Sequence, residues 1–184
     1  VHICTPPMSH YQLVKLCLEC NKHVVCEKPL CLSPQQCREL VELARQRDLV
    51  NAVNFNVRFY GACLQARETI SQADFGKPLL IQCSYQQEFH ALPEADSWRY
   101  HPELAGHLRA TTEIGSHCID LIHYWTGLDV ISLSANFGNF NPVRYRSDGI
   151  MYSERTSDSS AIEVASEDAA VVSLKFSNGA IGNM

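Results

Sequence analysis

Two clusters of ionisable side chains in this sequence could carry out proton-transfer chemistry. The first is Glu27-Lys28-Pro29, which follows a short apolar run. A lysine at the end of a strand can present its ammonium group to a ligand, and burial can lower its pKa toward that of a general acid. The carboxylate of Glu27 could accept hydrogen bonds from a ribose. A solvated ion pair in a loop is the alternative interpretation of the same residues.

The second cluster consists of Glu113, His117, Asp120 and His123. Residues three or four positions apart share one face of a helix. A carboxylate beside a histidine suits proton abstraction, because one group orients while the other takes the proton. A helix with surface ion pairs explains the spacing as well. A metal site is a third reading, although the spacing matches neither H-E-x-x-H nor a glutamate with histidine three residues later.

Trp98-Arg99 could stack on a ligand ring and hold a phosphate or carboxylate. A partly buried tryptophan with the arginine stem lying along it is the alternative. The C-x-x-C pair Cys17 and Cys20 has no second pair to complete a zinc site. Most of the nine cysteines lie in apolar runs, which favours core thiols in a reduced, cytoplasmic protein.

The elements that must position these residues alternate over the first third of the chain. Short apolar runs predict strands at 1–4, 23–27 and 49–55. Helices are expected between them, the first capped by Ser9 and the second opened by a capping box at Ser33, with Leu40, Val41 and Ala44 on its buried face. Such alternation predicts a parallel sheet whose ligands bind beyond the carboxyl ends of the strands.

The remainder of the chain has the pattern of an α+β domain. Helices are expected at 60–73 and 114–125, the latter ending at Gly127. Strands are expected at 79–89, 130–137 and 169–176. Residues 90–112 look irregular, and 147–167 look polar enough for a mobile loop.

Composition excludes several classes of protein. The 184 residues carry 15 basic and 20 acidic groups, a net charge of −5, and are 46% hydrophobic, which fits a globular chain with a core. No apolar stretch approaches the ~18 residues of a membrane span. An acidic chain without a basic run is a poor nucleic-acid binder. The first glycine is Gly61, so residues 1–60 contain no glycine-rich phosphate loop.

Four runs together resemble the glucose–fructose oxidoreductase, inositol dehydrogenase and MocA family: VHICTPPMSH, HVVCEKPL, EIGSHCIDLIHYWTG and SEDAAVVSLKFSNGAIGN. The resemblance implies a Rossmann domain followed by an α+β domain with a large, open, mainly antiparallel sheet. It places the back half of the Rossmann domain at 1–58 and a substrate and oligomerisation domain at 59–184. The sequence is then read as a fragment, since the family's glycine fingerprint is expected before Val1.

The resemblance also assigns roles to residues. Lys28 and His117 match the family's proton-handling pair, and Glu113 stands where an aspartate commonly binds substrate. Asp120 matches an acid one helical turn further on, which would orient the histidine. Residues implied to contact the cofactor are Thr5, Pro6, His10, Glu27, Lys28, Trp98 and Arg99. The Lys28–Pro29 bond is often cis in relatives.

The function implied is hydride transfer between NAD or NADP and a hydroxyl carbon of a sugar, polyol or related compound. The expected partners are a small-molecule substrate and further copies of the chain, as a homodimer or homotetramer, without metal, nucleic acid or membrane. Three alternatives stay open: an NAD-dependent glycoside hydrolase of the same fold, a non-enzymatic sensor or binding protein, and a metal hydrolase built on the second cluster.

Overall fold

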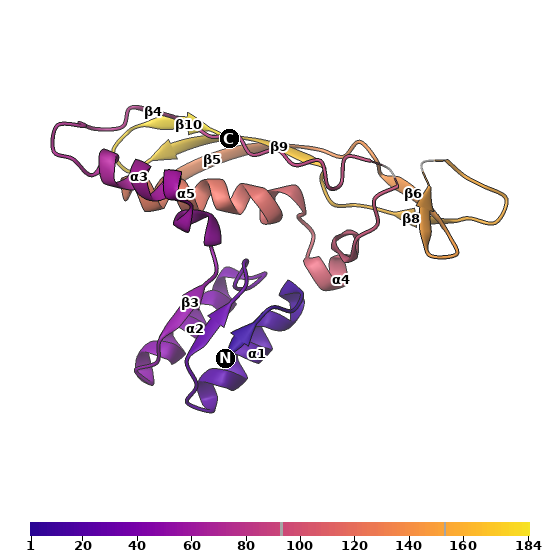
Figure 1. Cartoon of the computed structure of the whole chain (residues 1–184), viewed down its shortest axis with the longest axis horizontal. Helices are drawn as coiled ribbons and strands as arrows, with labels where there is room; N and C mark the ends of the chain where they lie inside the picture. The colour runs from indigo at the N-terminus through magenta and orange to yellow at the C-terminus, as the bar shows by residue number, and fades with distance from the viewer. Residues whose placement is uncertain (93, 153) are drawn as a thin grey trace. The chain divides into compact units, whose positions relative to one another are not determined.

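The computed structural model describes residues 1–92, 94–152 and 154–184 and divides into two compact units. The first unit comprises Val1–Phe55 and His101–His107, and the second comprises Asn56–Tyr100 and Leu108–Met184. Both are drawn in Figure 1. Among the helices of the described residues, none combines the length and apolar character needed to cross a membrane.

The first unit is a small parallel sheet with helices, as the alternating pattern predicts. The sheet has the order β1-β2-β3, and both strand pairs are parallel. Its elements are β1 (His2–Ile3), a 3₁₀ turn (Pro7–Ser9), α1 (His10–Glu19), β2 (Val24–Cys26), α2 (Pro34–Gln46), β3 (Asn51–Val53) and α4 (Pro102–Ala105).

One apolar core joins the helices and the sheet of this unit. Leu18 of α1 is completely buried, and Cys26 and Leu40 are almost so. Apolar residues at helical spacing therefore face the sheet, as expected. Val41 was expected on the same face, but that prediction is wrong, since its side chain is 55% exposed.

The two helix starts are where the sequence places them, but the expected capping contacts are wrong. Ser33 precedes α2 in an extended conformation without a side-chain cap, and Pro34 occupies the first turn. Proline has its φ already fixed near the helical value, so it favours a start at this position. Ser9 precedes α1, but its hydroxyl donates to the Pro6 carbonyl at 2.9 Å instead of capping the helix.

The second unit has two sheets, and its larger sheet is mainly antiparallel, as expected. The larger sheet has the order β4-β10-β9-β5, with only β4 and β10 parallel, and the smaller has the order β7-β6-β8. The helices are α3 (Gly61–Ile70) and α5 (Ser116–Thr126). The strands are β4 (Leu80–Gln82), β5 (Val130–Gly138), β6 (Val143–Ser147), β7 (Ile150–Tyr152), β8 (Ser160–Glu163), β9 (Ala169–Phe176) and β10 (Ile181–Asn183).

Alternation along β9 decides which face of the larger sheet is buried. Val172, Leu174 and Phe176 are buried and pack in one cluster with Ile122 of α5. Figure 1 shows α3 and α5 on this side of the sheet. The intervening residues of β9 are exposed, so the opposite face is open among the described residues.

Three expected elements differ from the structure. The helix predicted at 60–73 is the shorter α3, and the strand predicted at 79–89 is only β4. The mobile loop predicted at 147–167 is wrong, because β7 and β8 lie within it and pair with β6. These strands have only three and four residues, too few to show the alternation that reveals a strand in sequence. The helix stop at Gly127 is confirmed, with φ of 67° and its amide donating to the His123 carbonyl.

Gly182 of β10 has no room for a side chain. A Cβ there would lie 2.4 Å from the Ile81 carbonyl oxygen of the neighbouring strand. We expect Gly182→Ala to lower the free energy of unfolding by about 1–3 kcal/mol, because the two strands must separate to admit the methyl group. Gly61→Ala is the matched control, since a Cβ at Gly61 meets no atom within 4 Å. Equal denaturation midpoints for the two variants would contradict this close packing.

Candidate functional site

The carboxyl edge of the parallel sheet carries the first cluster. The Glu27 amide donates to the Ile3 carbonyl and the Asn54 amide to the Cys26 carbonyl, which extends the pairing beyond the strands. The side chain of Asn54 donates to the Glu27 carboxylate at 2.6 Å. The Glu27 carboxylate is thereby fixed at the edge where ligands of parallel sheets bind.

His10 joins two loops of this edge. Its ring is completely buried, with Nδ1 2.8 Å from the Pro29 carbonyl and Nε2 2.7 Å from the Thr5 carbonyl. The Thr5 hydroxyl is 2.6 Å from that of Ser9, and the Lys28–Pro29 bond is cis, as expected. His10 therefore holds the loop after β1 against the loop after β2 through the backbone of Thr5 and Pro29.

The donor set at this edge suits the nicotinamide half of a dinucleotide. A fixed carboxylate at Glu27 can accept hydrogen bonds from ribose hydroxyls, and the next residue, the half-buried Lys28, carries an ammonium group. Thr5 and Pro6 form the neighbouring turn on the same edge. The residues present therefore fit a nicotinamide nucleoside.

The second cluster begins in a π-helical turn. Thr111–Gly115 forms this turn and continues directly into α5. A π turn widens the helix and offsets side chains from the expected four-residue spacing, and such turns are frequent at functional sites. We expected Glu113 and His117 to share one face of a regular α-helix, but Glu113 lies in the π turn, so the spacing between their side chains differs from that of an α-helix.

Glu113 is paired with Arg99 at 2.9 Å, and the Arg99 guanidinium lies 4.4 Å from the centre of the Trp98 ring. The structure thus brings together three residues from the two segments that the sequence singled out. His117 is buried on α5, with its ring centre 6.1 Å from that of Tyr85.

Asp120 binds an arginine that we did not single out. Nε of Arg58 donates to the Asp120 carboxylate at 2.6 Å, and a second guanidinium nitrogen contacts the other oxygen. This hydrogen bond is the main reason that the pKa of Arg58 is raised. The guanidinium also stacks over Tyr124 at 4.9 Å. Asp120 therefore ties α5 to the turn at Asn56–Phe59.

His123 lies apart from these residues. Its ring is exposed, with Nδ1 3.2 Å from the Leu128 carbonyl and 3.5 Å from Asp129. Across the described ranges, no group of three or more histidine, cysteine or acidic residues could hold a metal ion. The contact of His123 with Asp129 fits the alternative interpretation of the second cluster, a helix with surface ion pairs.

A cavity of about 670 Å³ in the second unit includes Arg99 and Glu113 in its wall. Ionisable groups from distant segments also line it: His90, Asp96, Arg109 and Asp168. Phe89 and Phe140 supply aromatic surface. A polar cavity with aromatic walls can bind a small molecule that carries several hydroxyl groups.

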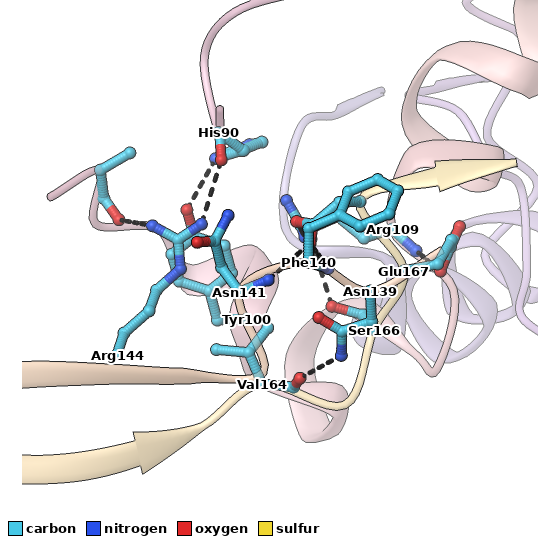
Figure 2. Close-up of polar contacts among 12 residues, drawn as sticks. His90, Tyr100, Arg109, Asn139, Phe140, Asn141, Arg144, Val164, Ser166 and Glu167 are labelled. Carbon is cyan, nitrogen blue, oxygen red and sulfur yellow. Dashed lines mark hydrogen bonds and ion pairs between the residues drawn. The ribbon is translucent and has the colours of Figure 1, made fainter. Parts of the chain in front are cut away.

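A network of hydrogen bonds and an ion pair around Arg109, which the sequence did not predict, shapes this cavity (Figure 2). The Glu167 carboxylate accepts from the amides of Arg109 at 2.9 Å and Thr111 at 2.8 Å, which anchors the entry to the π turn. The Arg109 guanidinium binds Asp168 and donates to the Ser166 hydroxyl at 3.2 Å. These partners lie more than 50 residues apart in sequence, and no local pattern signals such contacts.

Burial opposes ionisation of Asp168, but donors to its carboxylate outweigh this effect and lower its pKa. They are the amides of Phe140 and Asn141, at 2.6 and 3.1 Å, and the Arg109 guanidinium. Burial lowers the pKa of His90, and the charges of Arg109, Arg99 and Arg144 lower it further. The cavity wall thus combines an ionised carboxylate with a neutral imidazole near neutral pH.

Two thiols share a hydrogen bond beside the second cluster. The bond from Cys118 lowers the pKa of Cys83 to about 7, although burial acts in the opposite direction. The same bond, together with burial, raises the pKa of Cys118. Cys118 directly follows His117 on α5.

We expect Cys83 to react with iodoacetamide increasingly as the pH rises through about 7, because the thiolate is the nucleophile. Cys118→Ala removes the donor and should move this midpoint to higher pH. Mass spectrometry of the alkylated peptide measures it, with the exposed thiol of Cys20 as internal reference. An unchanged midpoint in Cys118→Ala would refute the role of the thiol pair.

Comparison with known proteins gives a family match for both parts of the chain. Residues 1–55 match the profile described as oxidoreductase family, NAD-binding Rossmann fold. Residues 63–184 match that of the GFO/IDH/MocA C-terminal domain.

Individual relatives agree with these profiles. The chain is 27% identical to levoglucosan dehydrogenase of Pseudarthrobacter phenanthrenivorans, over 100% of this chain and 48% of the relative. It is also 27% identical to D-glucoside 3-dehydrogenase of Escherichia coli, over 98% of this chain and 49% of the relative. The chain spans about half the length of the curated relatives it matches.

Solved structures of similar proteins cover the whole chain. A levoglucosan dehydrogenase in complex with NADH and L-sorbose superposes with a TM-score of 0.88 at 27% identity, over 100% of this chain and 46% of that one. An oxidoreductase domain protein from Kribbella flavida gives 0.87 at 29% identity, again over 100% and 46%. One family profile matches the parallel sheet of the first unit, and the other matches most of the second unit. The chain therefore belongs to the GFO/IDH/MocA family of oxidoreductases.

Proposed function

We propose that the protein containing this chain is an NAD(P)-dependent oxidoreductase that moves a hydride between the nicotinamide ring and a hydroxyl carbon of a sugar, polyol or related compound. The observation that carries the proposal is the match of residues 1–55 to an NAD-binding profile and of 63–184 to the C-terminal domain of the same family. We assign residues 1–58 to the nucleotide domain and 59–184 to the substrate and oligomerisation domain.

In this proposal the sheet edge of the first unit holds the nicotinamide nucleoside. Glu27, fixed by Asn54, would accept hydrogen bonds from the ribose, and the turn at Thr5 and Pro6, held by His10, would help to hold the nicotinamide. Trp98 and Arg99 contribute further cofactor contacts. When bound, the nicotinamide supplies the group that accepts or gives the hydride.

Lys28 and His117 manage the proton of the substrate hydroxyl. The Lys28 ammonium donates a hydrogen bond to the hydroxyl oxygen and stabilises negative charge that develops there. The His117 imidazole takes the proton during oxidation and returns it during reduction. Glu113 binds a neighbouring hydroxyl, with Arg99 holding one side of its carboxylate. Asp120 acts on His117 only through α5, since its carboxylate is bound to Arg58.

The cavity of the second unit supports a polyhydroxylated substrate. Carboxylates, arginines and amide groups line it and can pair with sugar hydroxyls, and Phe89 and Phe140 can cover the apolar face of a sugar ring. The relatives named levoglucosan dehydrogenase and D-glucoside 3-dehydrogenase act on compounds of this class.

Loss of the proton-handling groups tests this assignment. The full-length protein should reduce NAD⁺ or NADP⁺ with at least one of levoglucosan, methyl glucoside, glucose and myo-inositol, followed by absorbance of the reduced cofactor. We expect Lys28→Met and His117→Asn each to lower kcat by about 10²–10⁴-fold, because each removes a proton donor or acceptor. The exposed residues Lys22 and His107 provide controls, as Lys22→Met and His107→Asn.

Full turnover in both site variants would rule out the roles of Lys28 and His117. Release of a cleaved sugar without net reduced cofactor would instead identify the redox-neutral glycoside hydrolase. Failure of every compound with both cofactors, in a protein that binds NAD⁺ by calorimetry, would favour a sensor.

We further propose that the open face of the larger sheet pairs with a second copy of the chain. The strand register places on this face the exposed side chains of Leu80, Val171 and Ile181, each about 60% exposed. Ser132 and Ser134 of β5 and Ser173 and Lys175 of β9 share this face, and the small serines allow a second sheet to approach closely. We also place the protein in the cytoplasm, which the nine free cysteines support.

We expect the protein to run as a dimer or tetramer in light scattering and Val171→Asp to shift it toward monomer. A buried unpaired carboxylate at such an interface costs several kcal/mol. Ile150→Asp is the matched control, since Ile150 is similarly exposed but lies on β7 of the smaller sheet. A monomeric wild-type protein, or an unchanged mass for Val171→Asp, would contradict the proposal.

A further inference from the structure

Arg144 is a completely buried arginine on β6, the central strand of the smaller sheet. Its guanidinium donates to three backbone carbonyls of one irregular segment: His90 at 3.0 Å, Leu92 at 2.8 Å and Ala95 at 3.2 Å. Figure 2 shows the side chain reaching from the strand toward this segment. A single planar group therefore fixes the segment at several points, which the fork geometry of arginine allows.

Tyr100 adds a second attachment. The Arg144 guanidinium lies 4.5 Å from the centre of the buried Tyr100 ring, and the Tyr100 hydroxyl is 3.1 Å from Nδ1 of His90. The His90 and Tyr100 rings also meet edge to face, with centres 5.4 Å apart. His90 is consequently held by its carbonyl and by its ring.

The held segment forms part of the cavity wall. His90, Ala91, Asp96 and Ser97 line the cavity, whereas Arg144 does not. The described part of residues 83–97 contains no helix or strand, so no regular hydrogen-bond ladder fixes its shape. Irregular backbone needs other partners when it is partly buried. The Arg144 guanidinium provides hydrogen-bond donors for three of these backbone carbonyls without itself lining the cavity.

We propose that Arg144 is a positioning residue for the ligand cavity: from a place outside the cavity, it holds the segment carrying His90 and Asp96 in the shape that the ligand meets. The proposal rests on the proposed function only in taking this ligand to be the substrate. Arg146, two residues along β6, reinforces the same wall by binding the Asp96 carboxylate at 2.5 and 2.6 Å. Arg144 thus sets affinity, while proton transfer remains with Lys28 and His117.

Two variants of the full-length protein test this role. Arg144→Met removes all three carbonyl contacts, and Arg144→Lys keeps the charge but cannot reproduce the planar fork. We expect amide hydrogen exchange at residues 90–92 and 94–97 to rise by about tenfold or more in Arg144→Met and by less in Arg144→Lys. Exchange in α5 should stay unchanged. Arg155→Met, at an exposed site between β7 and β8, is the control.

Kinetics supply the readout that a merely structural role would not move. The substrate is whichever of levoglucosan, methyl glucoside, glucose and myo-inositol the wild-type protein turns over. Its KM should rise about tenfold in Arg144→Met, with kcat within about twofold. Arg144→Lys should recover part of the loss. A fall in kcat with unchanged KM would overturn the proposal, because Arg144 would then act on the reacting groups.

Hydrogen exchange decides the outcome even when other parts fail. If Arg144→Met does not fold, Arg144→Lys gives the same comparison with a smaller expected change. If the wild-type protein turns over none of the four test compounds, the proposed function fails, while faster exchange at 90–92 and 94–97 still shows that Arg144 holds this part of the cavity wall. Wild-type exchange at these amides in a folded Arg144→Met protein would refute it.

Discussion

Two guanidinium groups on one buried tyrosine hold together the part of the molecule that forms the cavity. Arg144 lies 4.5 Å and Arg109 5.1 Å from the centre of the Tyr100 ring. Arg144 reaches this ring from the smaller sheet, and Arg109 from the segment that enters the π turn before α5. Tyr100 is therefore the point where separate elements of the second unit meet. The cavity depends on this stack, because most of its wall has no regular secondary structure.

The two positive charges are stabilised in different ways. Arg109 binds Asp168, whose carboxylate also accepts from the amides of Phe140 and Asn141. Arg144 donates to the carbonyl oxygens of His90, Leu92 and Ala95. A buried charge is tolerated only where such polar partners replace water. Arg144 fixes backbone directly and Arg109 does so through Asp168, which explains how irregular segments keep a defined shape.

The first unit fixes its functional edge by simpler means. Parallel strands bring the loops after β1 and β2 together, and the buried ring of His10 bridges their carbonyls. Asn54, after β3, then holds the Glu27 carboxylate. Regular strand pairing does most of the positioning here, whereas side chains do most of it in the second unit.

This difference explains how far the sequence could be interpreted. The alternating strands and helices of residues 1–55, the strands at 130–137 and 169–176 and the stop at Gly127 could all be predicted, because each leaves a local pattern. The strands β7 and β8 could not, since three and four residues are too few to show a strand period, and they are defined by pairing with β6. The π turn before α5 also leaves no local signal.

For the site, the sequence by itself determined which residue types stand at the strand edge and on the helix: Glu27, Lys28, Glu113 and His117. Only the tertiary structure decided their partners. Arg99 pairs with Glu113 and Arg58 with Asp120, across 14 and 62 residues of sequence. Such pairs depend on where the folded backbone places each group, and hydrogen bonds act over only about 3 Å. Chain patterns report local periodicity, so contacts made by folding, such as those of Arg144, appear only in three dimensions.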